Sequence, residues 1–333
     1  MKRKIAVYAI CKNEAAFCER WIRSMREADE IVVLDTGSED ASAEILRTLG
    51  AKVFEKKIVP WRFDEARNEA LSHVPDDVDI CVAADLDEVF SPGWRRALEE
   101  KWAENTTRAR FKYVWSFRPD GSEGTVLYLD KIHGRTGYRW YYPVHEALIR
   151  TDGKADAPDN YITLDSVQLN HYPDNKKSRA QYLDLLELSF KENPFDPRAA
   201  HYLGREYMYL GMWEQAIKVL FKHVSMPASV WKEEKCASYR YMGRCYMNLM
   251  DYKNAENAFL NAVLTAPHLR EGYYELANLL YLKKEYAGCA HYCIKALEII
   301  DRPTEYISED AAWNGNIENL LNEAKRACLL SFR

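Results

Sequence analysis

The sequence lacks any apolar run that approaches the roughly 20 residues of a membrane-spanning helix. Near its start, Ile5–Cys11 is apolar, but Lys12 and Glu14 end the run, which favours a buried strand over the core of a secretory signal. We therefore expect neither a membrane span nor a signal peptide, and we expect a cytoplasmic protein.

An excess of charge of one sign is also missing. The 46 Lys and Arg residues nearly balance the 51 Asp and Glu residues, and the net charge is −5. A dominant field for nucleic acid or a membrane surface is therefore not expected. The eight cysteines form no CxxC pair. Cys289 and Cys293 lie one helical turn apart without nearby histidines, so we interpret them as buried thiols rather than zinc ligands, which fits a reducing compartment.

The first part of the chain alternates between apolar β-forming runs and amphipathic stretches. We expect strands at Ile5–Ile10, Ile31–Leu34, Ala51–Phe54 and Ile80–Ala84, and helices at residues 13–28, 38–50 and 64–71. This alternation is typical of an α/β fold with a Rossmann-like, mostly parallel sheet. Such sheets bind ligands beyond the carboxyl ends of their strands, where Asp35 and Asp85 stand.

The later part of the chain first becomes β-rich and aromatic from Ala109, and then helical after Lys176. A residue pattern recurs there three times, with gaps of 39 and 34 residues. Its members are Leu203, Gly204, Tyr207, Gly211, Trp213, Ala216 and Leu220, then Met242, Gly243, Tyr246, Met250, Tyr252, Ala255 and Phe259, then Leu276, Ala277, Leu280, Lys284, Tyr286, Cys289 and Cys293. A 34-residue period is the tetratricopeptide signature. We expect a first domain at residues 1–175, a linker helix at 176–196, and all-α repeats with a capping helix at 197–333.

The strongest chemical signal is the acidic stretch Asp85-Leu86-Asp87-Glu88, which directly follows an expected strand. Two carboxylates in positions i and i+2 of an extended chain point the same way. Oxygen ligands of this kind suit Mg²⁺ or Mn²⁺ bound together with phosphates. Taken alone, the stretch fits a solvated turn equally well.

Three further motifs accompany the acids: CKNE at residues 11–14, VVLDTGSED at 32–40 and FDEARN at 63–68. Together with DLDE, and in this order, they resemble the family 2 glycosyltransferases with a GT-A fold, over about residues 4–175. The resemblance implies an inverting enzyme that uses a nucleoside diphosphate sugar, UDP-linked, and Mn²⁺ or Mg²⁺. It implies nucleotide-sugar contacts from Ile10, Cys11, Asp35, Thr36, Arg67 and Asp85. It implies that Asp87 ligates the metal and that His171 is a further ligand, although His171 equally suits a structural role.

The stretch between Tyr138 and Glu146 supplies candidates for the acceptor side. An inverting displacement needs a carboxylate within reach of the attacking atom, and Glu146 is our candidate for this general base. Its alternative roles are to orient His145 or to bind a sugar hydroxyl. Trp140, Tyr142 and His145 are candidates for acceptor binding, while the aromatic residues, Trp140 above all, suit a core equally well.

Two other functions could explain the same motifs. One is a peptide-binding repeat scaffold with a vestigial nucleotide domain. The presence together of Asp85, Asp87, Arg67 and His171 argues against it. The other is a nucleotidyltransferase, which favours a glycine-rich phosphate loop that residues 10–14 lack. The expected partners are a nucleotide-sugar donor and a saccharide or peptide acceptor, with the repeats holding the acceptor or joining two subunits as a homodimer. Nucleic acid is not an expected partner.

Overall fold

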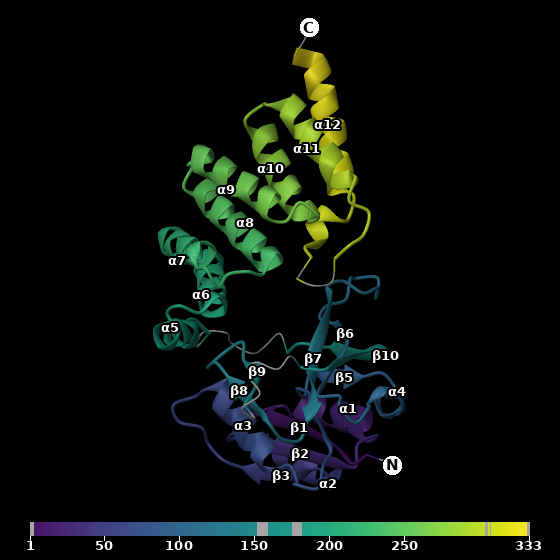
Figure 1. The fold of residues 1–333 in the computed structure, drawn as a ribbon. Helices are drawn as coiled ribbons and strands as arrows, with labels where there is room; N and C mark the ends of the chain where they lie inside the picture. The colour runs from purple at the N-terminus through teal and green to yellow at the C-terminus, as the bar shows by residue number, and fades with distance from the viewer. Residues whose placement is uncertain (1–2, 152–158, 175–181, 304–305, 307, 332–333) are drawn as a thin grey trace. The chain divides into compact units, whose positions relative to one another are not determined.

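The chain forms two compact units, Met1–Arg179 and Ala180–Arg333. The computed structural model describes residues 3–151, 159–174, 182–303, 306 and 308–331, and Figure 1 labels their helices and strands. The division falls inside the segment 176–196 that we expected to be a linker helix. Within it, α5 occupies Tyr182–Glu192, while residues 175–181 lie outside the described residues.

The first unit is built on a sheet of eight described strands in the order β3-β2-β1-β4-β7-β6-β10-β5. Neighbours β3, β2, β1 and β4 are all parallel, and β7 then runs antiparallel to β4. A separate hairpin pairs β8 with β9. The strands are β1 (Ile5–Cys11), β2 (Glu30–Asp35), β3 (Lys52–Glu55), β4 (Ile80–Ala83), β5 (Glu88–Phe90), β6 (Arg108–Val114), β7 (Val126–Gly134), β8 (Tyr138–Tyr141), β9 (Ala147–Arg150) and β10 (Tyr161–His171).

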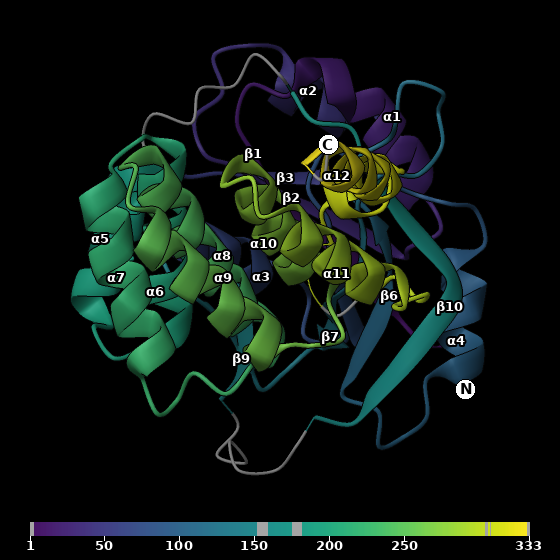
Figure 2. The same ribbon diagram turned by 90° about the horizontal axis from the view of Figure 1, so that it is seen from above.

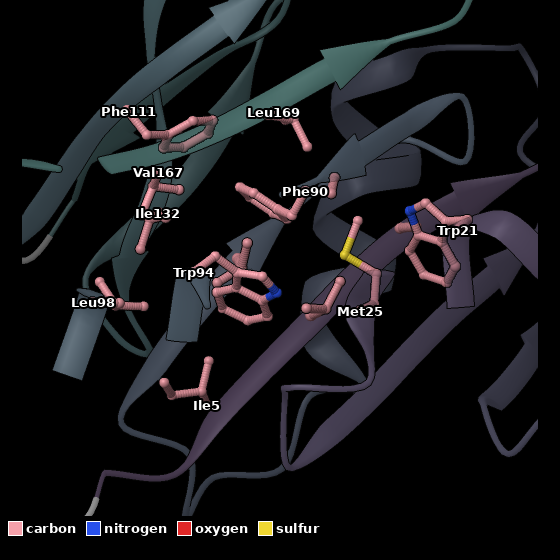
Figure 3. Close-up of a cluster of buried hydrophobic side chains, with 14 of the residues drawn as sticks. Ile5, Trp21, Met25, Phe90, Trp94, Leu98, Phe111, Ile132, Val167 and Leu169 are labelled. Atoms are coloured by element: carbon pink, nitrogen blue, oxygen red, sulfur yellow. The ribbon is translucent and has the colours of Figure 1, made fainter. Parts of the chain in front are cut away.

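The central strand β1 is apolar along its whole length because both faces of the sheet are covered. Ile5 and Val7 belong to a core on one face that includes Trp21, Phe90 and Trp94, and Figure 3 shows part of this cluster. The alternate residues of β1 belong to a second core together with residues of β2 and α3. A continuous apolar run, rather than strict alternation, is what a strand buried on both faces requires.

Four helices accompany the sheet in the described part of this unit. They are α1 (Ala15–Met25), α2 (Ser42–Thr48), α3 (Phe63–Ser72) and α4 (Trp94–Lys101). The helix expected at residues 38–50 is shorter than the sequence indicated. The reason is the carboxylate of Asp35, which accepts the backbone N–H groups of Gly37 and Ser38 at 2.8 Å each and so folds residues 36–38 into a turn.

The second unit is a stack of antiparallel helix pairs, which Figures 1 and 2 show lying side by side. After α5, its helices are α6 (Pro197–Tyr209), α7 (Trp213–Ser225), α8 (Lys232–Asn248), α9 (Tyr252–Thr265), α10 (Arg270–Leu282), α11 (Tyr286–Leu297) and α12 (Asn316–Ser331). A Cβ atom on Gly204 would lie 2.6 Å from Leu220, and one on Gly243 would lie 2.2 Å from Phe259. The small residues of the repeat pattern therefore let paired helices approach closely, as tetratricopeptide repeats require.

The unequal spacing of the repeats has a local cause. Helix α8 has 17 residues where the equivalent α10 has 13, and the loop before α8 is also longer than the loop before α10. The extra residues therefore lie in this loop and in α8, which accounts for the longer first gap of the repeat pattern. Helix α12 follows the last pair, at the place of the expected capping helix.

The chain after α11 folds back across helices α6, α8 and α10. The hydroxyl of Tyr306 lies 2.7 Å from Nε2 of His201. Glu309 forms ion pairs with Arg240 and Arg244 on α8. The pKa of Glu309 is lowered to about 2, because the two arginines outweigh the effect of burial, which acts in the opposite direction. These contacts fasten the segment around residue 309 to the repeats.

Two sequence expectations about the whole chain can be compared with the structure. All eight cysteines are thiols, and both Cys289 and Cys293 are buried, which confirms that this pair consists of buried thiols. Among the described residues, no helix is long and apolar enough to cross a membrane.

Candidate functional site

The carboxyl ends of β1 and β2 meet at one edge of the sheet. Cys11 and Asp35 are register partners there. The hydroxyl of Thr36 donates to the carbonyl oxygen of Cys11 at 3.0 Å, and the backbone N–H of Thr36 donates to the same oxygen at 2.9 Å. Ile10, Cys11, Asp35 and Thr36, four of the expected nucleotide contacts, thus come from the ends of two adjacent strands. Burial raises the pKa of the Cys11 thiol to about 12, so this thiol is neutral near pH 7.

The two carboxylate oxygens of Asp35 differ in their hydrogen bonding. Oδ1 accepts two backbone N–H groups of the turn, whereas Oδ2 is buried and has no hydrogen-bond partner among the described residues. A buried oxygen of this kind is costly unless a ligand satisfies it. A cavity of about 300 Å³ adjoins it and is lined by Asp35, Gly37, Ser38, Ala43, Glu55, Lys56 and Lys57. The strand edge therefore offers a hydrogen-bond acceptor to a ligand.

Arg67 on α3 joins two of the expected site residues that are far apart in the sequence. Its Nη1 lies 2.9 Å from Oδ1 of Asp85, its Nη2 donates to Oδ2 of Asp85 at 3.0 Å, and its Nε donates to Glu146. The guanidinium is buried, with 6% of its side chain exposed. Burial lowers the pKa of Arg67, but Asp85 and Glu146 outweigh burial and raise it well above its usual value. Asp85, Arg67 and Glu146 therefore form one ionised group.

Lys131, which sequence reasoning missed, and Glu88 of the acidic stretch complete this charge cluster. The Nζ of Lys131, on β7, donates to Asp85 at 3.2 Å and to Glu88 at 3.1 Å. Burial raises the pKa of Asp85, but Arg67 and Lys131 more than offset this and hold it far below its usual range. Lys131 follows no recognisable motif. It faces the acids because β7 pairs with β4, and no local pattern in the chain indicates that pairing.

Asp87 and His171 lie opposite one another at the junction of β5 and β10. Oδ2 of Asp87 and Nε2 of His171 are 3.4 Å apart. Nδ1 of His171 lies 3.0 Å from the carbonyl oxygen of Trp115, and a carbonyl can only accept, so Nδ1 carries a proton. Burial lowers the pKa of His171, but Asp87 and the Trp115 carbonyl outweigh burial and raise it. The structure thus brings the two expected metal ligands together.

The segment that joins β8 and β9 carries the expected acceptor residues. Tyr142 and His145 adopt positive φ angles of 79° and 51°, which is uncommon for residues other than glycine and is concentrated at functional sites. Glu146 follows His145 directly and accepts a hydrogen bond from Arg67. Both Tyr142 and His145 are half-buried.

Trp140 is the exception among these candidates. It is 3% exposed, and its indole N–H donates to the hydroxyl of Tyr8 at 2.8 Å. Asn68 bonds both the N–H and the carbonyl of Trp140, which fixes β8 on α3. The guanidinium carbon of Arg67 lies 5.1 Å from the centroid of the Trp140 ring. The prediction that Trp140 contacts an acceptor is therefore wrong in this structure. The hydrophobic effect and the indole hydrogen bond place its side chain in the core.

The unit thus has a GT-A-type architecture, with a curled, mostly parallel sheet whose strand ends carry the acids. A sequence model of Glycosyl transferase family 2 matches residues 6–148, and this part of the chain is a family 2 glycosyltransferase domain. An uncharacterised glycosyltransferase of Rickettsia bellii is 45% identical over 62 residues, which are 18% of this chain and 20% of the relative. A similar protein of Rickettsia typhi is 43% identical over 60 residues. The chain thus spans about a fifth of the length of these relatives.

The second unit has similarities of its own. A TPR repeat-containing protein of Synechococcus elongatus is 27% identical over 154 residues, which are 44% of this chain and 35% of that protein. Among solved structures, MamA matches with a TM-score of 0.33 and 21% identity, over 47% of this chain and 91% of that chain. The helix pairs and their small contact residues identify the unit as a tetratricopeptide-repeat array.

Proposed function

We propose that this protein is an inverting glycosyltransferase. It moves a sugar from a nucleoside diphosphate sugar, UDP-linked, to a hydroxyl or thiol of the acceptor. The observation that carries the proposal is the facing pair of Asp87 and His171 beside the ionised cluster of Arg67, Asp85 and Glu146. A vestigial domain serving only as a scaffold would have no need to keep so many charges at a sheet edge, since burying charges costs stability unless they are paired.

The proposal includes a divalent cation, Mn²⁺ or Mg²⁺, and Asp87 and His171 are the residues that would hold it. The chemistry of these donors fits, because a carboxylate oxygen and an imidazole whose other nitrogen is fixed by a carbonyl are common metal ligands. When bound, the cation supplies positive charge that stabilises the departing diphosphate. Asp85 does not share this role in our proposal, because Arg67 and Lys131 already engage its carboxylate.

The edge formed by β1 and β2 is the proposed nucleoside site. Oδ2 of Asp35 accepts a hydroxyl of the ribose or an N–H of the base. Ile10, Cys11 and Thr36 come from the same two strand ends, and the cavity next to Asp35 gives the ligand room. Arg67 and Asp85 are the further nucleotide-sugar contacts in this proposal, and they pair with one another at 2.9 Å.

The proposed transfer is a single displacement. The acceptor O–H or S–H gives its proton to Glu146, its oxygen or sulfur bonds to the anomeric carbon, and the bond from that carbon to the diphosphate breaks. Since the hydrogen bond from Arg67 engages Oε1 of Glu146, we assign Oε2 to the acceptor. Tyr142 and His145 lie beside Glu146 and contact the acceptor in this proposal. Inversion follows because the acceptor attacks opposite the departing group.

The test is transfer by the full chain from a panel of nucleoside diphosphate sugars, with Mn²⁺ or with EDTA. We expect the glycosylated product to form in Mn²⁺ and not to form in EDTA. Glu146→Gln should retain donor affinity while kcat falls by 100-fold or more, on the order of what general-base catalysis supplies. A drop in donor affinity as large as the drop in kcat would instead make Glu146 a residue that positions Arg67. Retained configuration of the product by NMR would contradict the single displacement.

For the repeats we propose that they hold the acceptor, a saccharide or a peptide. Support comes from exposed aromatic groups such as Tyr209, which is 63% exposed and suits contact with sugar or peptide. Tyr209→Ser should reduce transfer while donor hydrolysis stays unchanged. A homodimer formed through the repeats is the rival use of this unit. A molecular mass that rises with protein concentration in sedimentation equilibrium would support it.

The cysteine thiols support a reducing, cytoplasmic location in this proposal.

A further inference from the structure

A second group of metal-type ligands lies inside the repeat unit, apart from the residues of the proposed glycosyltransferase site. His201 on α6, His223 on α7 and Glu234 on α8 each offer one ligand atom, and these atoms lie within 4.8 Å of one another. The three residues are 0%, 0% and 5% exposed. Buried groups of this kind are paired with one another or coordinate metals.

Two separations within the group match those around a tetrahedral ion. Nε2 of His223 and Oε1 of Glu234 are 3.4 Å apart. Two ligands bound at about 2.0–2.1 Å to a tetrahedral Zn²⁺ would be about 3.3 Å apart. The ring centroids of His201 and His223 are 5.3 Å apart with planes inclined by 56°. Two imidazoles on one such ion would have centroids about 5.2 Å apart.

The contacts of the group leave its carboxylate without a permanent cation. Nε2 of His223 pairs with Ser229 at 2.9 Å. In the described part of the chain, the ion-pair partner of the buried Glu234 carboxylate is again His223. A buried carboxylate without a permanent cation is costly in an interior, and a metal ion held between Nε2 of His223 and Glu234 would supply that charge.

A fourth donor and an orienting contact are already in place. The hydroxyl of Tyr306 lies 2.7 Å from Nε2 of His201. Nδ1 of His201 lies 2.7 Å from Oγ of Ser238, which fixes the orientation of the ring as contacts behind metal ligands do. Tyr306 comes from the chain after α11, so the four donors come from four separate segments of the unit.

We propose that His201, His223 and Glu234 bind a Zn²⁺ ion, with the hydroxyl of Tyr306 in the fourth position. Two imidazoles and two oxygens in a closed, buried site suit Zn²⁺ better than Mg²⁺, which prefers oxygen ligands and water. The ion would link the first three repeat helices to the chain after α11. Its role would be structural, since all four positions are filled by the protein.

The experiment uses the full chain carrying Asp87→Ala, so that the proposed cation site of the first unit does not contribute. The protein is stripped with EDTA and titrated with Zn²⁺ against a chromophoric chelator, and with Co²⁺ for its visible absorption. We expect one equivalent of Zn²⁺, bound more tightly than about 1 µM, a tetrahedral Co²⁺ spectrum and a higher melting temperature. Glu234→Gln, which preserves size, should weaken binding by at least 100-fold.

The matched control is His268→Gln, which removes an exposed histidine that pairs with Glu233 at 2.9 Å. It should bind Zn²⁺ as the parent does. His223→Gln should behave as Glu234→Gln does, and if it fails to fold, Glu234→Gln and Tyr306→Phe decide. Binding that is weaker than about 100 µM, or equally strong in the parent and in Glu234→Gln, would overturn the proposal and leave a hydrogen-bonded histidine cluster.

Discussion

The charge cluster of the first unit is most sharply tested by Arg67→Lys, which preserves the positive charge. Arg67 contacts both oxygens of Asp85, at 2.9 and 3.0 Å, and donates a third hydrogen bond to Glu146. A lysine ammonium has no planar fork and cannot serve both carboxylates in this way. The substitution therefore tests geometry rather than charge.

The expected cost follows from the lost contacts. Hydrogen bonds to charged groups contribute about 1.5–3 kcal/mol each. If lysine retains one of the three, the loss is about 3–6 kcal/mol, close to the cost of breaking a buried ion pair. For a unit of this size, 1 kcal/mol corresponds to about 2–4 °C in melting temperature. A loss of 3 kcal/mol would thus lower the melting temperature of the first unit by about 6–12 °C.

Differential scanning calorimetry of the full chain would measure this shift, since it can resolve two unfolding units. The control is Arg96→Lys, because Arg96 is 86% exposed and pairs with Glu100 on the helix surface, where such pairs contribute little. A shift for Arg67→Lys that is no larger than the shift for Arg96→Lys would refute the idea that this arginine holds the cluster together.

Three further predictions concern the cation, the repeat unit and its packing. Asp87→Ala should remove Mn²⁺-dependent thermal stabilisation by UDP without unfolding the chain, because the Asp87 side chain is 24% exposed. Because the folded-state pKa of Glu309 is lowered to about 2, its stabilisation should be complete above about pH 5 and lost as the pH falls toward 2, by at most about 3 kcal/mol relative to Glu309→Gln in urea unfolding. Gly243→Ala should cost about 1–2 kcal/mol in the same assay, since the new Cβ would lie 2.2 Å from the ring of Phe259 and overpacking outweighs the gain in helix propensity.

Each of these predictions has a matched control. Asp120→Ala removes an acid from an exposed turn and should leave the response to Mn²⁺ and UDP unchanged. For Glu309, an equal pH dependence in wild type and Glu309→Gln would show that the arginine pairs contribute nothing. Gly288→Ala is the control for packing, because its new Cβ would lie 3.2 Å from the nearest atom, on Leu280. It should be less destabilising than Gly243→Ala.

The repeat architecture could be predicted in detail because its causes are local. A period of 34 residues with small residues at fixed places requires paired helices in contact, and Gly204 and Gly243 indeed lie against Leu220 and Phe259. The early strands were equally predictable, since a strand buried on both faces needs a continuous apolar run. The start of α2 was not, because the turn at Asp35 uses side-chain hydrogen bonds that compete with the helix.

The sequence by itself determined the order of the units, the acids at the strand ends and the candidates Asp87 and His171, because each lies in a short motif. Only the tertiary structure decided that Arg67 bridges Asp85 and Glu146, that Lys131 faces the same acids, and that Trp140 belongs to the core. These contacts join residues from α3, β7 and β8 that are distant along the chain. Sheet order and burial decide which of them meet, and neither is encoded in a local pattern.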